Sequence, residues 1–197
     1  MTLEMFANDT SLALCSHQKQ MLVVFLKGIN VGGHKLFRPS LLANALAKYG
    51  VVNVGAAGTF VVMKQISQGR LRGELIRRLP FQTEIMICSA REIVGLASAE
   101  PFAGEPSGKD IVHFVSVLAK RPRTIPSFPI ALPPGEDWLL KIKGVRGRFA
   151  FGFYRRTTRT IGLFSRLEKH LGQSATTRNW NTITTIIGIL KSNGARP

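Results

Sequence analysis

The sequence predicts an α+β fold, in which a ferredoxin-like β-α-β-β-α-β subdomain is followed by a second, smaller and less regular α+β subdomain. In the first hundred residues, short apolar runs alternate with segments whose apolar residues recur at helical spacing. A stretch rich in Gly, Pro and Ser, Ala103–Lys109, then separates this pattern from the rest of the chain. A length of 197 residues is sufficient for two small subdomains. We therefore expect the first over residues 21–102, a linker over residues 103–110 and the second over residues 111–192.

Each element of the first subdomain has its own signal. Leu22–Leu26 is a continuous apolar run, typical of a central strand buried on both faces. Pro39 and Ser40 open a helix that runs to about Tyr49 and stops at Gly50. The remaining expected elements are strands at Val51–Val54 and Thr59–Met63, a helix capped by Ser67 and ended by Pro80, a strand at Thr83–Cys88, and a helix that begins with the capping box of Ser89 and Glu92 and closes at Pro101.

The second subdomain begins with a strand at Ile111–Leu118, and five prolines within Lys120–Asp137 then favour extended structure. Apolar and polar residues alternate in Trp138–Lys143, which predicts a half-buried strand. The other expected elements are a turn at Gly144–Gly147, a returning strand at Arg148–Tyr154, a basic turn at Arg155–Arg159, a helix at Phe164–Leu171 ended by Gly172, and a final helix at Thr182–Leu190.

The charge of the chain is the main indication of a partner. The formal net charge is +16 and the isoelectric point is near 11.0. From Lys120 to Arg178 there are 13 Lys and Arg residues against three acidic ones. Such a surface attracts phosphate backbones, acidic membranes or anionic metabolites, and we expect nucleic acid or a nucleotide as the partner. The alternative is that arginine serves here only as a solvated surface residue.

Other features of the composition narrow the class of protein. No apolar run approaches the roughly 20 residues that span a bilayer, so no membrane partner is expected. Residues 1–20 contain Glu4 and Asp9 and have no basic start, so a disordered leader is expected there and not a signal peptide, with residues 193–197 as a tail. Two cysteines without a disulfide pattern fit a cytoplasmic protein, and Cys88 is expected to be a core residue. The four histidines are widely spaced, so neither a metal nor a cofactor is expected.

The glycine turn after the first strand is one candidate ligand site. Gly28 and Gly33 have the spacing of a phosphate loop, but His34 and Lys35 stand where that motif needs Lys and Ser or Thr. An ATP-hydrolysing loop is therefore not expected, whereas backbone N–H groups turned toward an anion remain an option, as does a tight turn without a ligand. The ligand-binding residues predicted here are Lys27, Gly28, Asn30, Gly32, Gly33, Lys35 and Arg38.

The second candidate site is Thr177–Thr182. Arg178 offers a planar fork for phosphate or carboxylate, Trp180 offers a ring for stacking, and Asn179 and Asn181 offer amides. The alternative is that Trp180 anchors the last helix while a neighbouring side chain caps it. We predict that this stretch and the glycine turn approach each other and bind one anionic ligand.

A third candidate is the basic hairpin around Arg148–Tyr154. Alternation places Phe149, Phe151 and Phe153 on one face, expected to be the core, and Arg148 and Tyr154 on the other. An exposed basic face of this kind binds single strands, unless it is only solvated.

Four segments resemble the family catalogued as domain of unknown function 1697. They are Lys27–Gly33, Glu100–Phe102, Ser165–Lys169 and Thr177–Thr182, and the resemblance extends from about Met21 to Ser192. It implies an α+β fold of two subdomains, the first ferredoxin-like, and it implies no activity. The turn Ala56-Ala57-Gly58-Thr59 departs from the Gln-Ser-Gly-Asn usual in that family, so any site at this turn is expected to be altered.

Two other functions stay open at this point. An enzyme acting on a small anionic metabolite would need a titratable group in a pocket, and only His34, Lys27 or Lys35 is a candidate, with the catalytic residues unknown. A ligand-free interaction module would need neither a pocket nor a salt-sensitive partner.

Overall fold

The computed structural model describes residues 21–29, 37–98 and 100–194. Contacts divide the chain into two compact units: unit 1 comprises Met1–Ser98 and Thr185–Pro197, and unit 2 comprises Ala99–Thr184. The predicted leader, residues 1–20, and residues 195–197 of the predicted tail lie outside the described residues. The predicted subdomain boundaries themselves stay predictions.

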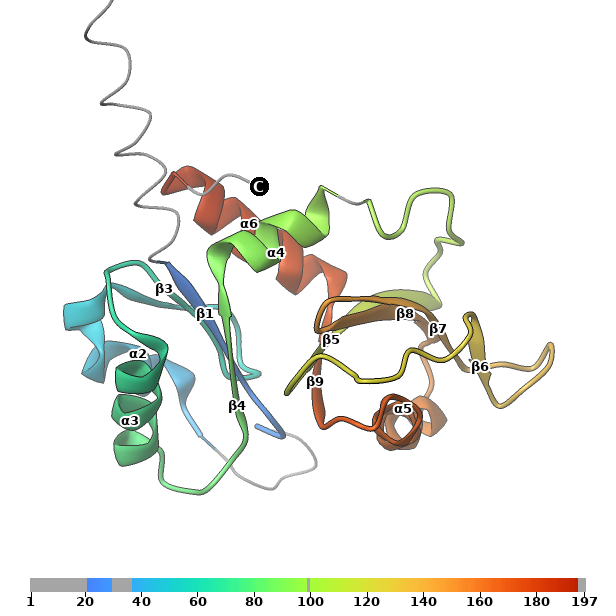
Figure 1. The fold of residues 1–197 in the computed structure, drawn as a ribbon, viewed down its shortest axis with the longest axis horizontal. Coiled ribbons are helices and arrows are strands. Elements are labelled where there is room, and N and C mark those ends of the chain that lie inside the picture. Colours follow the sequence, from blue (N-terminus) through green and yellow to red (C-terminus); the bar gives the residue numbers. More distant parts are fainter. Residues whose placement is uncertain (1–20, 30–36, 99, 195–197) are drawn as a thin grey trace, which may run out of the picture. The chain divides into compact units, whose positions relative to one another are not determined.

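Unit 1 follows the predicted order of elements (Figure 1). The elements are β1 (Leu22–Leu26), α2 (Pro39–Ala45), the 3-10 helix η1 (Ala47–Tyr49), β2 (Val51–Asn53), β3 (Thr59–Val62), α3 (Gln68–Arg78), β4 (Ile85–Ser89) and α4 (Ala90–Ala97). The four strands form one sheet in the order β2-β3-β1-β4, and every neighbouring pair is antiparallel. The α+β class is confirmed, and the assignment to the ferredoxin-like folds stays a prediction.

Burial of β1 on both faces organises unit 1. All five residues of the strand are buried, as its unbroken apolar sequence predicts. On one face Leu22, Val24 and Leu26 belong to a core that includes apolar residues of α2 and α3. On the other face α4 packs against β1 and β4. Cys88 on β4 is fully buried, in agreement with its expected place in the core.

The predicted helix caps are present in unit 1. The Ser67 hydroxyl accepts a hydrogen bond from Arg70 N at 3.3 Å, which starts α3. At α4, Glu92 N donates to Ser89 Oγ and Ser89 N donates to the Glu92 carboxylate at 2.8 Å, which completes the capping box. These bonds satisfy backbone N–H groups that the first helical turn leaves without a partner.

Unit 2 is built around a five-stranded antiparallel sheet in the order β6-β7-β8-β5-β9. The elements are β5 (Ile111–Leu118), β6 (Ile130–Leu132), β7 (Leu140–Arg146), β8 (Phe149–Arg155), the 3-10 helix η2 (Thr158–Leu163), α5 (Phe164–Leu171), β9 (Ala175–Asn179) and α6 (Trp180–Ser192). Gly172 ends α5 with φ of 59°, as expected of a glycine after a helix. The division between the units falls within α6, after Thr184.

One expectation for unit 2 is wrong, and one strand is not predicted at all. The expected turn at Gly144–Gly147 is mostly strand, because β7 continues to Arg146 after a register shift between Ile142 and Gly144. The stretch that contains Arg178, for which no element is predicted, forms the edge strand β9 and pairs with β5. Its polar sequence has no strand-like apolar pattern, so pairing with a neighbouring strand decides its conformation.

The expectation of an exposed basic face on β8 is also wrong. Ala150 and Tyr154 pack in the main core of unit 2, together with Leu167 and Leu171 of α5. The rings of Tyr154 and Phe164 lie 5.5 Å apart, centroid to centroid. Helix α5 therefore covers the face on which Tyr154 lies, and the other face carries Phe149, Phe151 and Phe153.

Among the described residues, no helix has the length and apolar character required to cross a membrane. The same part of the chain contains no group of three or more His, Cys, Asp or Glu residues arranged to hold a metal ion.

Candidate ligand sites

The glycine turn is described only at its start. Gly28 has φ of 66°, a left-handed conformation that glycine adopts without strain. Lys27 and Gly28 line a cavity of 520 Å³ together with Gln82, Thr83 and Glu84. Within it, Lys27 Nζ lies 3.5 Å from Glu84 Oε1, and Thr83 Oγ1 donates a hydrogen bond to Lys27 O. The cavity therefore carries both signs of charge, which weakens its attraction for an anion.

Of the other residues predicted at this turn, the structure describes only Arg38. Asn30, Gly32, Gly33 and Lys35 lie outside the described residues. Arg38 is exposed and precedes α2, but its side chain makes no capping hydrogen bond. The predicted approach of this turn to Arg178 concerns two different units and stays a prediction.

The altered turn Ala56-Ala57-Gly58-Thr59 has a structural reason for its glycine. Gly58 has φ of 69°, and a Cβ placed on it would lie 3.0 Å from atoms of both Leu26 and Ile29. Its carbonyl also accepts a hydrogen bond from Leu26 N at 2.8 Å. The glycine is therefore needed to pack the turn against the end of β1, whatever the neighbouring side chains do.

Strand alternation separates the residues of the Thr177–Thr182 motif. Arg178 is only 7% exposed, and its Nη1 donates to Thr176 Oγ1 and to Thr177 O, both at 2.8 Å. Burial lowers the pKa of Arg178 to about 10, because desolvation disfavours the charged form. Asn179 is exposed and caps α6, since its Oδ1 accepts hydrogen bonds from Thr182 N and Thr182 Oγ1.

The last three predicted residues of that motif share one cavity, which we call the Trp180 cavity. Its volume is 300 Å³. Its lining residues are Gly108, Lys109, Ile111, Val112, His113, Arg156, Asn179, Trp180 and Asn181. Arg178 is not among them. The cavity thus lies where β5 begins, β8 has ended and β9 passes into α6.

Backbone hydrogen bonds hold the two cations of the Trp180 cavity in place. Ile111 N donates to Gly108 O at 3.2 Å, which closes a turn around Lys109. Arg156 N donates to Asp110 O at 2.8 Å, which joins the end of β8 to the same turn. The pairing of Ile111 with Arg155 sets this register. Two segments far apart in sequence therefore bring Lys109 and Arg156 to one cavity.

An aromatic cluster supports the Trp180 cavity. The Phe102 ring stacks on His113 at 4.5 Å with an interplanar angle of 5°, and it meets Trp180 edge-on at 5.0 Å. His113 Nε2 donates to Pro106 O at 2.8 Å, which fixes the ring and its tautomer.

The electrostatics of the Trp180 cavity are one-sided. The lining residues named above include two cations and no carboxylate. Lys109 and Arg156 make no ion pair within the described part of the chain, although Asp110 is adjacent in sequence to Lys109. Burial raises the pKa of the nearby Tyr154 hydroxyl, and the positive charge of Arg156 acts in the opposite direction. The cavity therefore presents uncompensated positive charge next to an indole ring.

Three members of this site are not among the ligand-binding residues that the sequence predicts. Lys109 lies at the end of the predicted linker, where nothing indicates a partner. Arg156 lies in the basic turn next to the hairpin that is the third candidate site. Phe102 belongs to the segment Glu100–Phe102, which contributes to the family resemblance. That resemblance marks the segment but does not indicate what its residues do. Only the pairing of β5 with β8 and β9 brings these residues to His113 and Trp180.

The family of the chain is shown by its sequence. The model described as "Protein of unknown function (DUF1697)" matches residues 20–128, more than half of the chain. The chain belongs to the DUF1697 family. The match ends before Thr177–Thr182, so the segment that completes the Trp180 cavity lies outside the part that matches the DUF1697 model.

Other comparisons add little about the site. The chain is similar to a conserved bacterial protein from Streptococcus pneumoniae, with 16% sequence identity and a TM-score of 0.48, over 87% of this chain and 98% of that chain. No curated protein matches the sequence. Membership of the DUF1697 family therefore assigns no activity to the chain.

Proposed function

We propose that the protein binds a nucleotide, or an anion of similar build, in the Trp180 cavity. The observation that carries the proposal is the meeting of Lys109 and Arg156, without a carboxylate, beside the ring of Trp180. Lys and Arg are the usual partners of phosphate, and an indole ring stacks on any nucleobase. The amides of Asn179 and Asn181 add donors and acceptors of the kind that contact base edges.

The size of the cavity supports a small ligand. A volume of 300 Å³ lies at the lower end of the range of about 300–1,000 Å³ for small-molecule sites. One mononucleotide is a better match to this space than a duplex. The net charge of +16 supports fast capture of any anion, but it does not select one.

The test uses the fluorescence of Trp180. The chain has two tryptophans, so a Trp138→Phe variant reports on Trp180 alone. AMP is titrated into this variant, with adenosine and inorganic phosphate as separate arms. We expect AMP to quench Trp180 at lower concentration than either fragment, because it engages the ring and the cations together. Absence of quenching by AMP up to millimolar concentration contradicts the proposal.

A charge-matched pair of variants separates the site from the general basic surface. Arg156→Ala removes a cation that lines the cavity, whereas Arg159→Ala removes an exposed cation that does not line it. A lost hydrogen bond to a charged group costs about 1.5 kcal/mol, so Arg156→Ala should weaken AMP binding about tenfold. Arg159→Ala should change it less than twofold. Equal losses in both variants would mean that AMP senses only net charge.

A second candidate function is an enzyme that acts on a small anionic metabolite. It is favoured by one observation, that the imidazole of His113 lines the cavity and its Nδ1 is the nitrogen not bonded to Pro106. The nucleotide recovered after long incubation with the protein distinguishes the two functions. Unchanged AMP supports binding alone, and conversion that is lost in His113→Gln supports the enzyme.

A further inference from the structure

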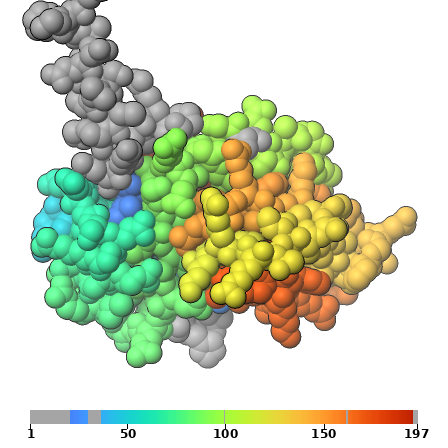
Figure 2. Space-filling model, viewed as in Figure 1, coloured from blue at the N-terminus to red at the C-terminus, as the bar shows by residue number. Residues whose placement is uncertain are grey.

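Unit 2 has a second cavity, which we call the basic cavity, at the opposite end of the β5–β9 pair. Its volume is 530 Å³. Its lining residues are Lys120, Arg121, Arg123, Thr124, Lys169, His170, Leu171, Gly172 and Gln173. Ala119 N donates to Ser174 O at 2.8 Å, which ties the segment after β5 to the segment before β9. The segment after β5, coloured yellow, lies at the molecular surface (Figure 2).

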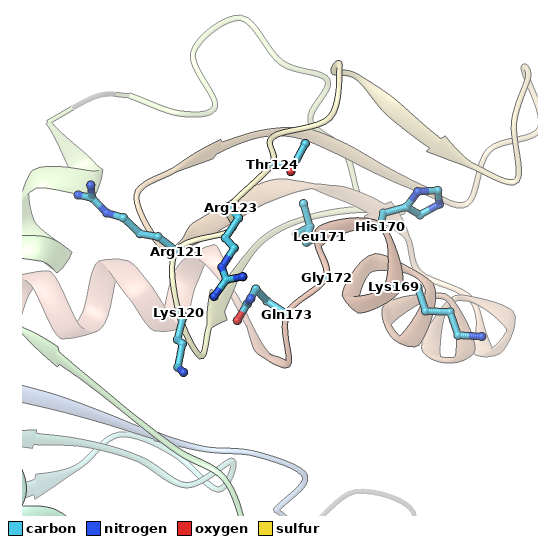
Figure 3. A pocket seen from close by; sticks show the side chains of 9 residues that line it. All are labelled: Lys120, Arg121, Arg123, Thr124, Lys169, His170, Leu171, Gly172 and Gln173. Carbon is cyan, nitrogen blue, oxygen red and sulfur yellow. The ribbon is translucent and has the colours of Figure 1, made fainter.

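The cations of the basic cavity do not all point the same way. Figure 3 shows Arg123 and Gln173 pointing toward one another, with Lys120 beside them. Arg121 points away in the same view, and a Cβ placed on Gly147 would lie 3.7 Å from Arg121 Nε, which puts this guanidinium next to the turn between β7 and β8. Lys120 and Arg123 are therefore the pair that a ligand in the cavity would meet.

Internal roles do not account for Lys120 and Arg123. Neither makes an ion pair within the described residues, and no carboxylate appears among the lining residues. Lys169 and His170 differ from them, because they lie in the last turn of α5, where positive charge stabilises the helix dipole. Two cations without a helix to stabilise, both close to one concave surface, favour an external anion.

The geometry points to a single-stranded nucleic acid as the ligand of the protein, with its backbone phosphates in the basic cavity. This inference rests on the proposed nucleotide site and specifies its ligand class. The Trp180 cavity adjoins His113 and the basic cavity adjoins Lys120, seven residues along β5 and its continuation, so roughly 20 Å separates them. A mononucleotide cannot reach both cavities, whereas a strand of several nucleotides spans that distance.

The surface of this cavity fits a strand better than an anionic membrane. The cations line a concave site, and the large exposed apolar residue near them in sequence is Ile125, 60% exposed. Binding to a bilayer surface normally needs a broad apolar face in addition to positive charge. Guanidinium and ammonium groups in a hollow are the arrangement that follows a phosphate backbone.

The test measures the salt dependence of binding to a fluorescein-labelled single-stranded RNA 12-mer by fluorescence anisotropy, between 50 and 200 mM KCl. Each phosphate contact with a single strand contributes about 0.7 to the slope of log K against log[salt]. The double variant Lys120→Ala/Arg123→Ala should therefore reduce the magnitude of the slope by about 1.4. Over this fourfold range of salt, the factor by which its affinity decreases should be about seven times smaller than the factor for the wild type. Arg121→Ala should leave the slope unchanged, since its side chain points away.

The salt dependence of RNA binding and the AMP titration report on the two cavities separately. A double variant with the wild-type slope, or an Arg121→Ala variant with a slope reduced by the same amount per charge, overturns the inference even if AMP still quenches Trp180. A slope reduced only in the double variant supports the inference even if AMP does not bind. Loss of binding to phosphatidylserine vesicles without any change toward the RNA also overturns it. Lys120→Gln/Arg123→Gln repeats the measurement if the alanine variant does not give the wild-type circular dichroism spectrum.

Discussion

Gly152 is the position in unit 2 where a single methyl group should do the greatest damage. It lies in β8 opposite Ile142 of β7 and Phe114 of β5. A Cβ placed on it would stand 1.9 Å from the carbonyl oxygen of Lys141. Carbon and oxygen atoms in close contact between strands are normally about 3.3 Å apart. Gly152→Ala therefore requires β7 and β8 to separate locally by about 1.4 Å.

The cost follows from the sheet that must open. A displacement of that size breaks ladder hydrogen bonds between β7 and β8, each worth about 1 kcal/mol, and overpacking adds about 1–3 kcal/mol. We expect Gly152→Ala to destabilise unit 2 by about 3 kcal/mol or more. For a chain of this size, 1 kcal/mol shifts the melting temperature by about 2–4 °C, so a decrease of about 6–12 °C is expected.

Tryptophan fluorescence is the assay, because Trp138 and Trp180 are the two tryptophans of the chain and both belong to unit 2. Thermal unfolding is followed at the emission maximum, and urea unfolding supplies the midpoint. Gly162→Ala is the matched control, because a Cβ there meets nothing within 4 Å. A melting temperature of Gly152→Ala within 2 °C of the wild type would refute the reasoning, since it would show that β7 and β8 accommodate the methyl group without opening.

Three further predictions concern stability. Asn179→Ala removes the cap of α6 and should lower the free energy of unfolding in urea by about 1 kcal/mol. Asn179→Asp keeps a capping oxygen and should lower it less. Equal losses of stability in the two variants would argue against the cap. Gly73→Ala adds a methyl group in open space on α3 and should stabilise unit 1 by up to about 1 kcal/mol. Unfolding is followed by far-ultraviolet circular dichroism, and a loss of stability would contradict this prediction. Glu74 is buried on α3, and although burial alone would raise its pKa, Arg77 and Arg78 outweigh this effect and lower the pKa. Its stabilising effect is therefore present above about pH 4.3 and lost as the pH falls through the lowered pKa. Glu74→Gln should destabilise the protein at pH 7 and make its stability depend less on pH in acid. An unchanged dependence of stability on pH would contradict this prediction.

The elements that the sequence predicted well are those with local causes. The apolar run of β1, the serine caps of α3 and α4, and the glycine that ends α5 each act within a few residues of themselves. Hydrophobic period and capping chemistry are short-range properties, so they can be read along the chain. The family was predicted from four short motifs instead, and the match of the DUF1697 model to residues 20–128 confirms it.

The candidate sites depended on the sequence in a different way. Asn179, Trp180 and Asn181 attracted attention as polar residues around an indole, and they do line one cavity. Arg178 has the same local signal, but strand alternation buries it against Thr176 instead. A one-residue difference in register therefore separates a cavity residue from a buried one, and the sequence alone does not set that register.

The sequence by itself determined the α+β class, most of the helices and strands, the family and the excess of positive charge. Only the tertiary structure decided that the polar segment of β9 is a strand, that helix α5 covers the face of Tyr154, and that Lys109 and Arg156 meet beside Trp180. The physical reason is distance along the chain. Pairing of β5 with β8 and β9 joins residues about 30 to 65 positions apart in the sequence. The energy of such contacts depends on distant partners that a local sequence pattern does not specify.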